Sequence, residues 1–276
     1  MASSIVKHRV RGMPAQDGAG VKLKRVINQP SFRHRDPILM LDEFKSDDPN
    51  DYIAGFPPHP HRGFCTLTYM LAGNMAHEDS NGNSGEISTG GLQWMKAARG
   101  MIHSEMPKQK NGLMWGFQLW LNLPAAEKMS DPDYADIPGD SVPEVPLEGG
   151  TVRVLSGEFN GQVGPVNAPG REFLYLDYRL PGGVNVTLPQ QHQQTRLLYV
   201  YQGSITVDGI TANEGELLEL DAEAEVPLTT GNEGNFLLMA AKPIGEPIAQ
   251  YGPFVMNTEA ELRQAFADYQ SGKLTA

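Results

Sequence analysis

Short runs in which apolar and polar residues alternate dominate the chain, and turn signals separate them. The clearest runs in the first half are 64–71 (FCTLTYML) and 117–123 (FQLWLNL), the second of which stops at Pro124. Alternation with a period of two, together with β-branched and aromatic residues, is typical of strands with one buried face. Asn81-Gly82 lies between two such runs and predicts a hairpin loop. The first half therefore predicts antiparallel β structure.

Strand-like runs fill the second half of the chain as well. They are 153–155, 173–180, 184–188, 197–201, 205–207, 217–220 and 236–240. Between the halves, residues 126–150 are rich in Pro, Asp, Glu and Gly, a composition that predicts a linker. We therefore expect an N-terminal domain at residues 1–125 and a C-terminal domain at residues 151–276.

The hydrophobic period changes only near the C-terminus. Thr258 and Glu261 have the spacing of a capping box, and Leu262, Phe266 and Tyr269 follow at helical spacing. This pattern predicts a short C-terminal helix, either as part of the fold or as a binding surface for a partner.

The two halves also resemble each other faintly. His61 precedes TLTYMLAG in the first half, and Gln190-Gln191-His192 precedes LLYVYQG in the second. The second half has neither a paired histidine nor a later His-x-Glu. Many short strands in two similar halves predict an all-β fold of two stacked antiparallel β-barrels of the jelly-roll type. We expect a metal in the first barrel only.

Four candidate metal ligands occur as two compact pairs. His59 and His61 flank Pro60, and His103 lies two residues before Glu105. Residues two apart on a strand share a face, so the pairs offer three imidazoles and a carboxylate. This donor set suits a borderline divalent metal such as iron, nickel, copper, zinc or manganese. Alternatively, His59 and His61 are surface residues beside a proline-rich turn.

Composition restricts the class of protein and its compartment. The net charge of −11 argues against a general nucleic-acid binder, and no apolar run is long enough for a membrane span. The single cysteine, Cys65, excludes an internal disulfide and suits the cytoplasm, or cytoplasm and nucleus in a eukaryote. We expect a monomer.

Basic residues concentrate at the N-terminus. Residues 1–35 contain eight Lys and Arg but only one acid, Asp17. The segment is either a basic arm for DNA or an acidic partner, or an edge ribbon that docks on an acidic body. The strand-like pattern of 21–27 (VKLKRVI) favours the ribbon.

Several motifs resemble those of the pirin family within the cupin superfamily. The segment from Gly55 through HPHRG to Gly73 looks like the first cupin motif, and Gly91 through GMIH looks like the second. HPHRGFCTLTYMLAG, LQWMKAARGMIHSEMP and GPFVMNTEAEL narrow the resemblance to pirins, and it spans essentially the whole chain.

The pirin resemblance implies a bicupin fold with one divalent metal in the N-terminal barrel. It places the ligands on His59, His61, His103 and Glu105. Glu105 supplies a carboxylate that cupins usually carry soon after the histidine pair, where this chain has Cys65 and Thr66. Iron(II) is the metal we expect first, with Ni, Cu, Zn, Mn and Co as alternatives.

The resemblance also implies an activity, quercetin 2,3-dioxygenation. In that reaction the heterocyclic ring of a flavonol is opened by dioxygen, carbon monoxide leaves, and Glu105 takes the proton of the 3-hydroxyl as general base. The alternative is an iron-dependent, redox-sensing regulatory protein that binds transcription factors or metabolic enzymes. A metal-dependent isomerase or hydrolase is a third possibility, because the fold hosts many chemistries.

Other residues have two interpretations each. Cys65 either faces the pocket or packs as a core thiol. His77 and Asp79 either orient a metal ligand or form a turn entry. Five large side chains either line a cavity for an aromatic substrate or pack in the core; they are Trp94, Met95, Trp115, Phe117 and Trp120. His192 has no partner at ligand spacing and is expected to be structural.

Overall fold

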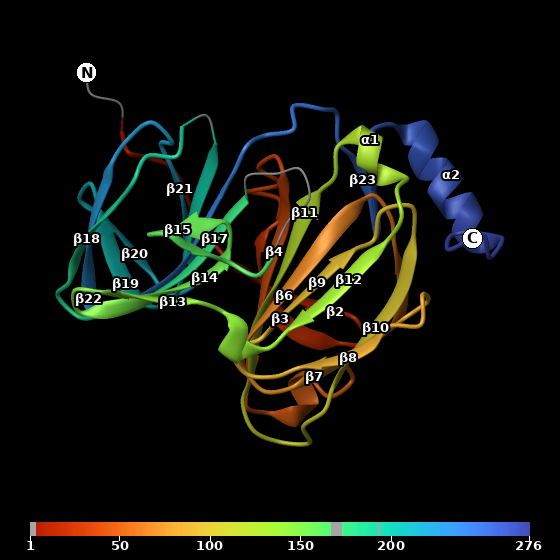
Figure 1. Ribbon diagram of the computed structural model, residues 1–276, viewed down its shortest axis with the longest axis horizontal. Helices are drawn as coiled ribbons and strands as arrows, with labels where there is room; N and C mark the ends of the chain where they lie inside the picture. The colour runs from red at the N-terminus through yellow and green to blue at the C-terminus, as the bar shows by residue number, and fades with distance from the viewer. Residues whose placement is uncertain (1–3, 167–172, 193) are drawn as a thin grey trace. The chain divides into compact units, whose positions relative to one another are not determined.

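The alternating runs of the sequence form antiparallel strands, and the computed structural model describes residues 4–166, 173–192 and 194–276. These residues form two compact units, each built from β-sheets (Figure 1). The prediction of an all-β protein with a short C-terminal helix is confirmed.

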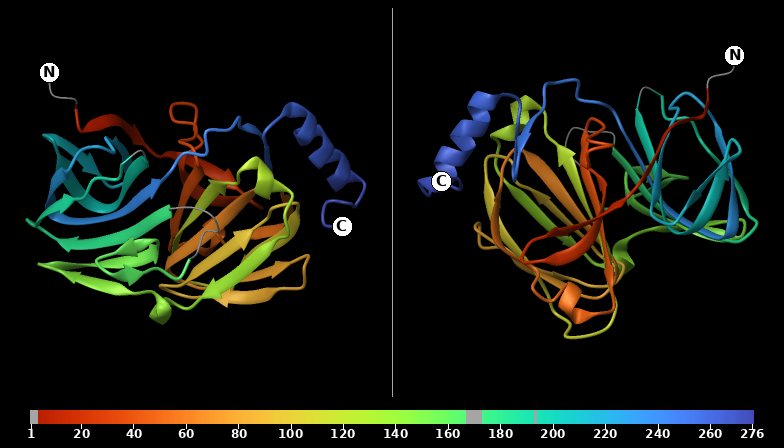
Figure 2. Two further views of the ribbon diagram at one scale, coloured as in Figure 1. Left: turned by 45° about the horizontal axis from the view of Figure 1, so that its top comes forward. Right: turned by 180° about the vertical axis from the view of Figure 1, so that it is seen from behind.

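The two units differ from the predicted domains of residues 1–125 and 151–276. The histidine unit, which contains the candidate ligands, comprises residues 14–25, 37–140 and 244–276. The second unit comprises residues 1–13, 26–36 and 141–243. The second half of the chain mainly forms the second unit, but the N-terminal residues belong to it too. The first half mainly forms the histidine unit, and the C-terminal residues belong to that unit. In Figure 2 the blue C-terminal segment lies beside the yellow strands, and the red N-terminal strand lies beside the teal strands.

Two antiparallel sheets form the histidine unit. The larger has the order β12 (Asp133–Ile137), β9 (Leu92–Lys96), β6 (Phe64–Ala72), β11 (Met114–Asn122), β4 (Ile38–Ser46), β3 (Val21–Ile27), β2 (Met13–Asp17). The smaller has the order β5 (Phe56–His61), β10 (Met101–Pro107), β7 (Met75–Asp79), β8 (Ser84–Ile87). Thr68 of β6 donates a hydrogen bond to Glu105 of β10, so the two sheets face each other.

Short elements complete the histidine unit. They are the 3-10 helix η1 (Pro49–Asp51), helix α1 (Ala125–Lys128), the hairpin β23 (Ala249–Tyr251) and β24 (Phe254–Met256), and helix α2 (Glu259–Gln270). The predicted capping box begins α2: Thr258 accepts from the backbone of Glu261, whose side chain accepts from the backbone of Thr258. No helix of the described residues is long and apolar enough to cross a membrane.

A nine-stranded antiparallel sheet forms most of the second unit. Its main order is β1 (Val6–Arg11), β21 (Glu216–Leu220), β19 (Thr195–Val207), β22 (Val226–Ala241), β17 (Phe173–Pro181), β14 (Gly150–Ser156), β13 (Glu144–Leu147), with β18 (Asn185–Leu188) on β22 and β20 (Ile210–Asn213) on β19. The small pair β15 (Glu158–Phe159) and β16 (Gln162–Val163) and the 3-10 helix η2 (Gly139–Ser141) complete the described elements. Apolar side chains such as Leu176, Leu198 and Phe236 fill its core.

Residues 126–150, which we expected to be a linker, contain regular structure. They hold most of helix α1 and the strands β12 and β13, which pair with β9 and β14. Both strands lie at the edge of their sheet, where proline and charged residues are tolerated because one side of the strand needs no partner. A composition rich in Asp and Pro therefore concealed two edge strands.

The basic N-terminal segment is an edge strand, as the ribbon interpretation predicts. Strand β1 pairs with β21. Its Arg9 forms a bidentate hydrogen-bonded ion pair with Glu216, and His8 lies 2.7 Å from Glu219. Further along, Arg25 holds Asp42 by two hydrogen bonds. The charge asymmetry of the sequence is thus matched by ion pairs inside each unit.

Candidate metal centre

Strands β5 and β10 place the candidate ligands opposite one another. They pair antiparallel, with His59 beside His103 and His61 beside Met101. The register shifts between His103 and Glu105, so that Glu105 lies opposite Phe56. The two histidines of one strand thus face the histidine of the other.

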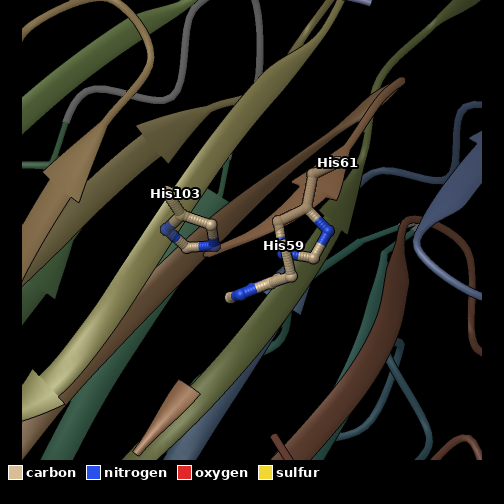
Figure 3. A group of neighbouring side chains, drawn as sticks. All are labelled: His59, His61 and His103. Atoms are coloured by element: carbon tan, nitrogen blue, oxygen red, sulfur yellow. The ribbon is translucent and has the colours of Figure 1, made fainter. Parts of the chain in front are cut away.

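The three histidines form one cluster. One ring nitrogen of each of His59, His61 and His103 lies within 4.8 Å of the other two. Their ring centroids are 4.3 to 4.9 Å apart. Figure 3 shows His103 coming from one strand and the other two from its neighbour, with the rings gathered in one space. The two histidines of β5 and the histidine of β10 are therefore brought together as the sequence predicts.

Hydrogen bonds leave each ring one nitrogen with a free lone pair. His59 Nδ1 lies 2.8 Å from the carbonyl of Pro57, which accepts only, so Nδ1 donates and Nε2 is the nitrogen that remains for a metal. His61 donates to the backbone carbonyl of Pro253, and its Nδ1 is buried without a partner. His103 Nε2 is likewise buried without a partner. Buried polar atoms are normally paired, so these nitrogens fit a missing ligand such as a metal ion.

Burial keeps two of these rings neutral. Desolvation lowers the pKa of His61 well below its usual 6.5, and the neighbouring His59 lowers it further. Desolvation is also the main cause that lowers the pKa of His103, with contributions from the other rings. A neutral imidazole is the form that binds a metal, so both ligands are ready at neutral pH.

Glu105, the fourth predicted ligand, lies on β10 two residues after His103, and the group of ligand atoms within 4.8 Å of one another comprises the three histidines without it. Its carboxylate is buried and accepts hydrogen bonds from Thr68 Oγ1 at 3.1 Å and from Gln118 Nε2 at 3.2 Å. These donors stand on the opposite sheet, so the carboxylate is held across the interior of the unit. The sequence pattern did not single out Thr68 or Gln118, although the parity of 64–71 places Thr68 on one face with Phe64.

One predicted aromatic residue contacts the cluster. The Trp120 ring lies 5.2 Å from that of His61, and Phe64 lies 5.0 Å from it. The Phe117 ring instead stacks on the Tyr69 ring. Trp115 donates a hydrogen bond to Glu43, and the Lys45 ammonium lies over its ring. These two therefore have packing roles elsewhere in the fold. Strand alternation places Trp94 on the face opposite Gln93 and Met95.

Cys65 and His192 stand outside the cluster. Cys65 is buried on β6, one residue before Thr66 and three before Thr68, so alternation places it on the face opposite Thr68. This agrees with the core-thiol interpretation. His192 is exposed and lies 2.6 Å from Glu223, which agrees with a structural role.

Two family profiles match the chain. The profile described as Pirin covers residues 20–121, and the profile described as Pirin C-terminal cupin domain covers residues 175–275. Together they span both halves of the sequence. The family resemblance carried by HPHRG and GMIHSE is therefore confirmed.

Relatives and solved structures agree with these profiles. A Pseudomonas aeruginosa protein that is provisionally named quercetin 2,3-dioxygenase is 50% identical over 273 residues, which cover 95% of each chain. Human Pirin is 37% identical over 264 residues, which cover 93% of this chain and 89% of the human protein. The crystal structure of quercetin 2,3-dioxygenase from Acinetobacter baumannii matches with a TM-score of 0.92 at 30% identity, covering 100% of this chain and 99% of that one.

Proposed function

This chain belongs to the pirin family, and on that premise we propose that it is a metal-dependent quercetin 2,3-dioxygenase. The observation that carries the proposal is the cluster of His59, His61 and His103, in which each ring keeps a nitrogen lone pair. Three imidazoles would hold a divalent metal while leaving coordination positions for substrate and dioxygen.

Iron(II) is the proposed metal. Imidazole suits Fe, Ni, Cu and Zn, and Co and Mn remain alternatives for the same donor set. When bound, a redox-active metal would acidify the 3-hydroxyl of a flavonol and make reaction with dioxygen possible. His59, His61 and His103 would hold it, and Glu105, whose carboxylate has acceptor sites beyond those used by Thr68 and Gln118, would be the fourth ligand.

Glu105 is the proposed general base. Its carboxylate is buried close to the histidine strands and accepts from Thr68 and Gln118. These two donors hold the side chain in one orientation, so that a free lone pair can take the proton of the 3-hydroxyl. Proton transfer to Glu105 would leave the flavonol as the anion that dioxygen attacks before the ring opens and carbon monoxide leaves.

Aromatic side chains favour a flat substrate. The rings of Phe64 and Trp120 lie 4.3 Å apart between centroids, tilted by 31°, beside His61. Such an apolar wall next to a polar centre is typical of sites that orient aromatic ligands. His59 is only half-buried, so this side of the cluster is open to an entering molecule.

The regulatory alternative loses one of its supports. A basic N-terminal arm was its candidate docking surface, but β1 is a paired strand whose Arg9 is engaged with Glu216. Docking through this segment would therefore use a paired strand with exposed Lys7 and His8 and not a free arm. Catalysis is the function that the geometry supports better.

The deciding experiment measures quercetin consumption and carbon monoxide release by Fe(II)-loaded protein, with and without dioxygen. We expect loss of flavonol absorbance and release of carbon monoxide only with dioxygen, and neither with His61→Ala. His192→Ala, which alters an exposed histidine outside the cluster, is the matched control. Metal-loaded protein that leaves quercetin intact would refute the dioxygenase proposal.

A further inference from the structure

We propose that Asp79 and His77 form a hydrogen-bonded relay that orients His103 and tunes the redox potential of the metal. The inference rests on the proposed function only in taking His103 as a metal ligand. It assigns a positioning role to two residues that the sequence left open between this role and a turn. The relay lies entirely in the smaller sheet of the histidine unit, on the neighbouring strands β7 and β10.

The three side chains form a continuous chain of contacts. Asp79 Oδ2 lies 3.2 Å from His77 Nε2, and His77 Nδ1 lies 3.4 Å from His103 Nδ1. The side chains of Asp79 and His77 are 0% and 1% exposed, so water does not compete for these contacts. A carboxylate is thus linked to the ligand through one intervening imidazole.

The order of donors and acceptors follows from the carboxylate. The Asp79 carboxylate accepts from Asn81 and Asn83 and likewise accepts from His77 Nε2, which leaves His77 Nδ1 as the nitrogen that accepts from His103. His103 must then donate from Nδ1, which leaves the lone pair on Nε2. That nitrogen is the buried atom of His103 without a partner. The relay therefore selects the tautomer that a metal ligand needs.

Hydrogen bonds and a ring contact hold Asp79 and His77 in place. Asp79 accepts hydrogen bonds from the backbone of Asn81 at 2.9 Å and from the backbone and side chain of Asn83 at 3.1 and 2.9 Å. The ring of Tyr134 stacks on His77 at 4.4 Å. Hydrogen bonds use all the lone pairs of the Asp79 carboxylate, and Tyr134 covers one face of the His77 ring. These contacts hold both side chains in their orientation.

The hairpin that carries Asp79 also forms hydrogen bonds with the residue that precedes the ligand His103. The backbone nitrogen of Ser80 donates to the carbonyl of Ile102 at 2.8 Å, and Ser80 Oγ accepts from the backbone of Ile102 at 3.1 Å. Ile102 immediately precedes His103. Backbone and side-chain contacts from one hairpin therefore fix the same ligand.

A buried negative charge at this distance changes the electronics of the site. Hydrogen bonding to an anionic chain makes His103 a stronger electron donor, which stabilises the higher oxidation state of a bound metal. Loss of the charge should therefore raise the Fe(III)/Fe(II) potential. Loss of the acceptor at His77 should weaken metal binding.

The test compares three substitutions in the relay with His103→Ala, which removes the ligand, all in the full-length protein. His77→Phe keeps a ring against Tyr134 but removes both hydrogen bonds, His77→Asn restores an acceptor near His103 Nδ1, and Asp79→Asn removes the charge. Co(II) binding to each variant is measured by titration followed by visible absorption. Each variant is then loaded with iron, and its Fe(III)/Fe(II) midpoint potential is measured by redox titration. Melting of the metal-free proteins shows whether each variant folds.

We expect His77→Phe to weaken Co(II) binding by about 10- to 100-fold and His77→Asn to recover most of it. Asp79→Asn should raise the iron potential. Retention of Co(II) by His103→Ala would refute the proposed metal site itself. If His103→Ala loses Co(II) while His77→Phe and Asp79→Asn match the wild type in affinity and potential, the relay is refuted and the metal site stands.

Discussion

Arg62 Nη1 donates a 2.6 Å hydrogen bond to Asp268 Oδ2, joining the residue after His61 to helix α2 across 206 positions of sequence. The guanidinium is buried and also donates to the carbonyls of Arg99 and Leu274. Together with the hydrogen bond from His61 to Pro253, these contacts make the C-terminal segment part of the histidine unit. The ligand strand is therefore held by the opposite end of the chain.

The Arg62–Asp268 pair should make the docking of α2 sensitive to acid. The Arg62 guanidinium holds the pKa of Asp268 below its usual 3.8. A depressed pKa in the folded state gives a stabilisation that is full above pH 3.8 and lost as the pH falls through the lower folded value. Asp268→Asn should thus lower the free energy of unfolding at pH 7 but much less at pH 3. Urea unfolding at both pH values tests this, with the exposed Glu86→Gln as control, and an equal loss at both would contradict it.

Lys128 is predicted to be essential for stability. Its buried ammonium donates to the carbonyls of Gly63 and Val255 and to Asn122 Oδ1, at 2.6 to 2.9 Å. Lys128→Met would leave three buried acceptors without this donor and destabilise the protein by about 2–4 kcal/mol. Urea unfolding provides the measurement, and Lys110→Met, at an exposed position, should be neutral. A Lys128→Met protein as stable as the Lys110 variant would rule out this role.

Gly63 is required by the close approach of the C-terminal segment. Its φ is +89°, and a Cβ there would lie 1.9 Å from the carbonyl oxygen of Val255. Gly63→Ala should displace residues near Val255 and reduce metal binding by His61. Gly209 has a φ of +74°, but a Cβ added there would meet no atom within 4 Å, so Gly209→Ala reports backbone strain alone, about 1 kcal/mol. Equal unfolding energies and equal Co(II) binding in the two variants would show that the approach is unimportant.

Features that depend only on residues close in sequence could be predicted from local patterns. Alternation located β6 and β11, the capping box located α2, and the spacing of His59, His61 and His103 located the cluster. These features follow from periodicity and from ligand pairs two residues apart on strands. The meeting of β5 with β10, which brings His103 to His59 and His61, is not a local feature, and for it the prediction relied on the resemblance to pirins.

Long-range features could not be predicted in this way. The exchange of chain ends between the units depends on partners such as Arg62 and Asp268, which no local pattern links. The position of Glu105 in the strand pairing depends on a register shift after His103, and its hydrogen bonds depend on donors from the other sheet. Parity along an ideal strand predicts that His103 and Glu105 share a face, but it predicts neither the irregular pairing nor the two donors to the carboxylate.

Glu105 should affect turnover more than metal content if it serves mainly as a base. Glu105→Gln keeps the shape of the side chain beside Thr68 and Gln118 but cannot take a proton, so we expect flavonol turnover to fall by at least about 100-fold. Iron content, measured on the same samples, should stay near the wild-type value if three histidines suffice and should drop if Glu105 is a fourth ligand. Glu105→Ala provides the stricter comparison, because it removes the side chain altogether. Unaltered quercetin turnover in Glu105→Ala would eliminate the carboxylate from the mechanism, since neither proton transfer nor ligation could then depend on it.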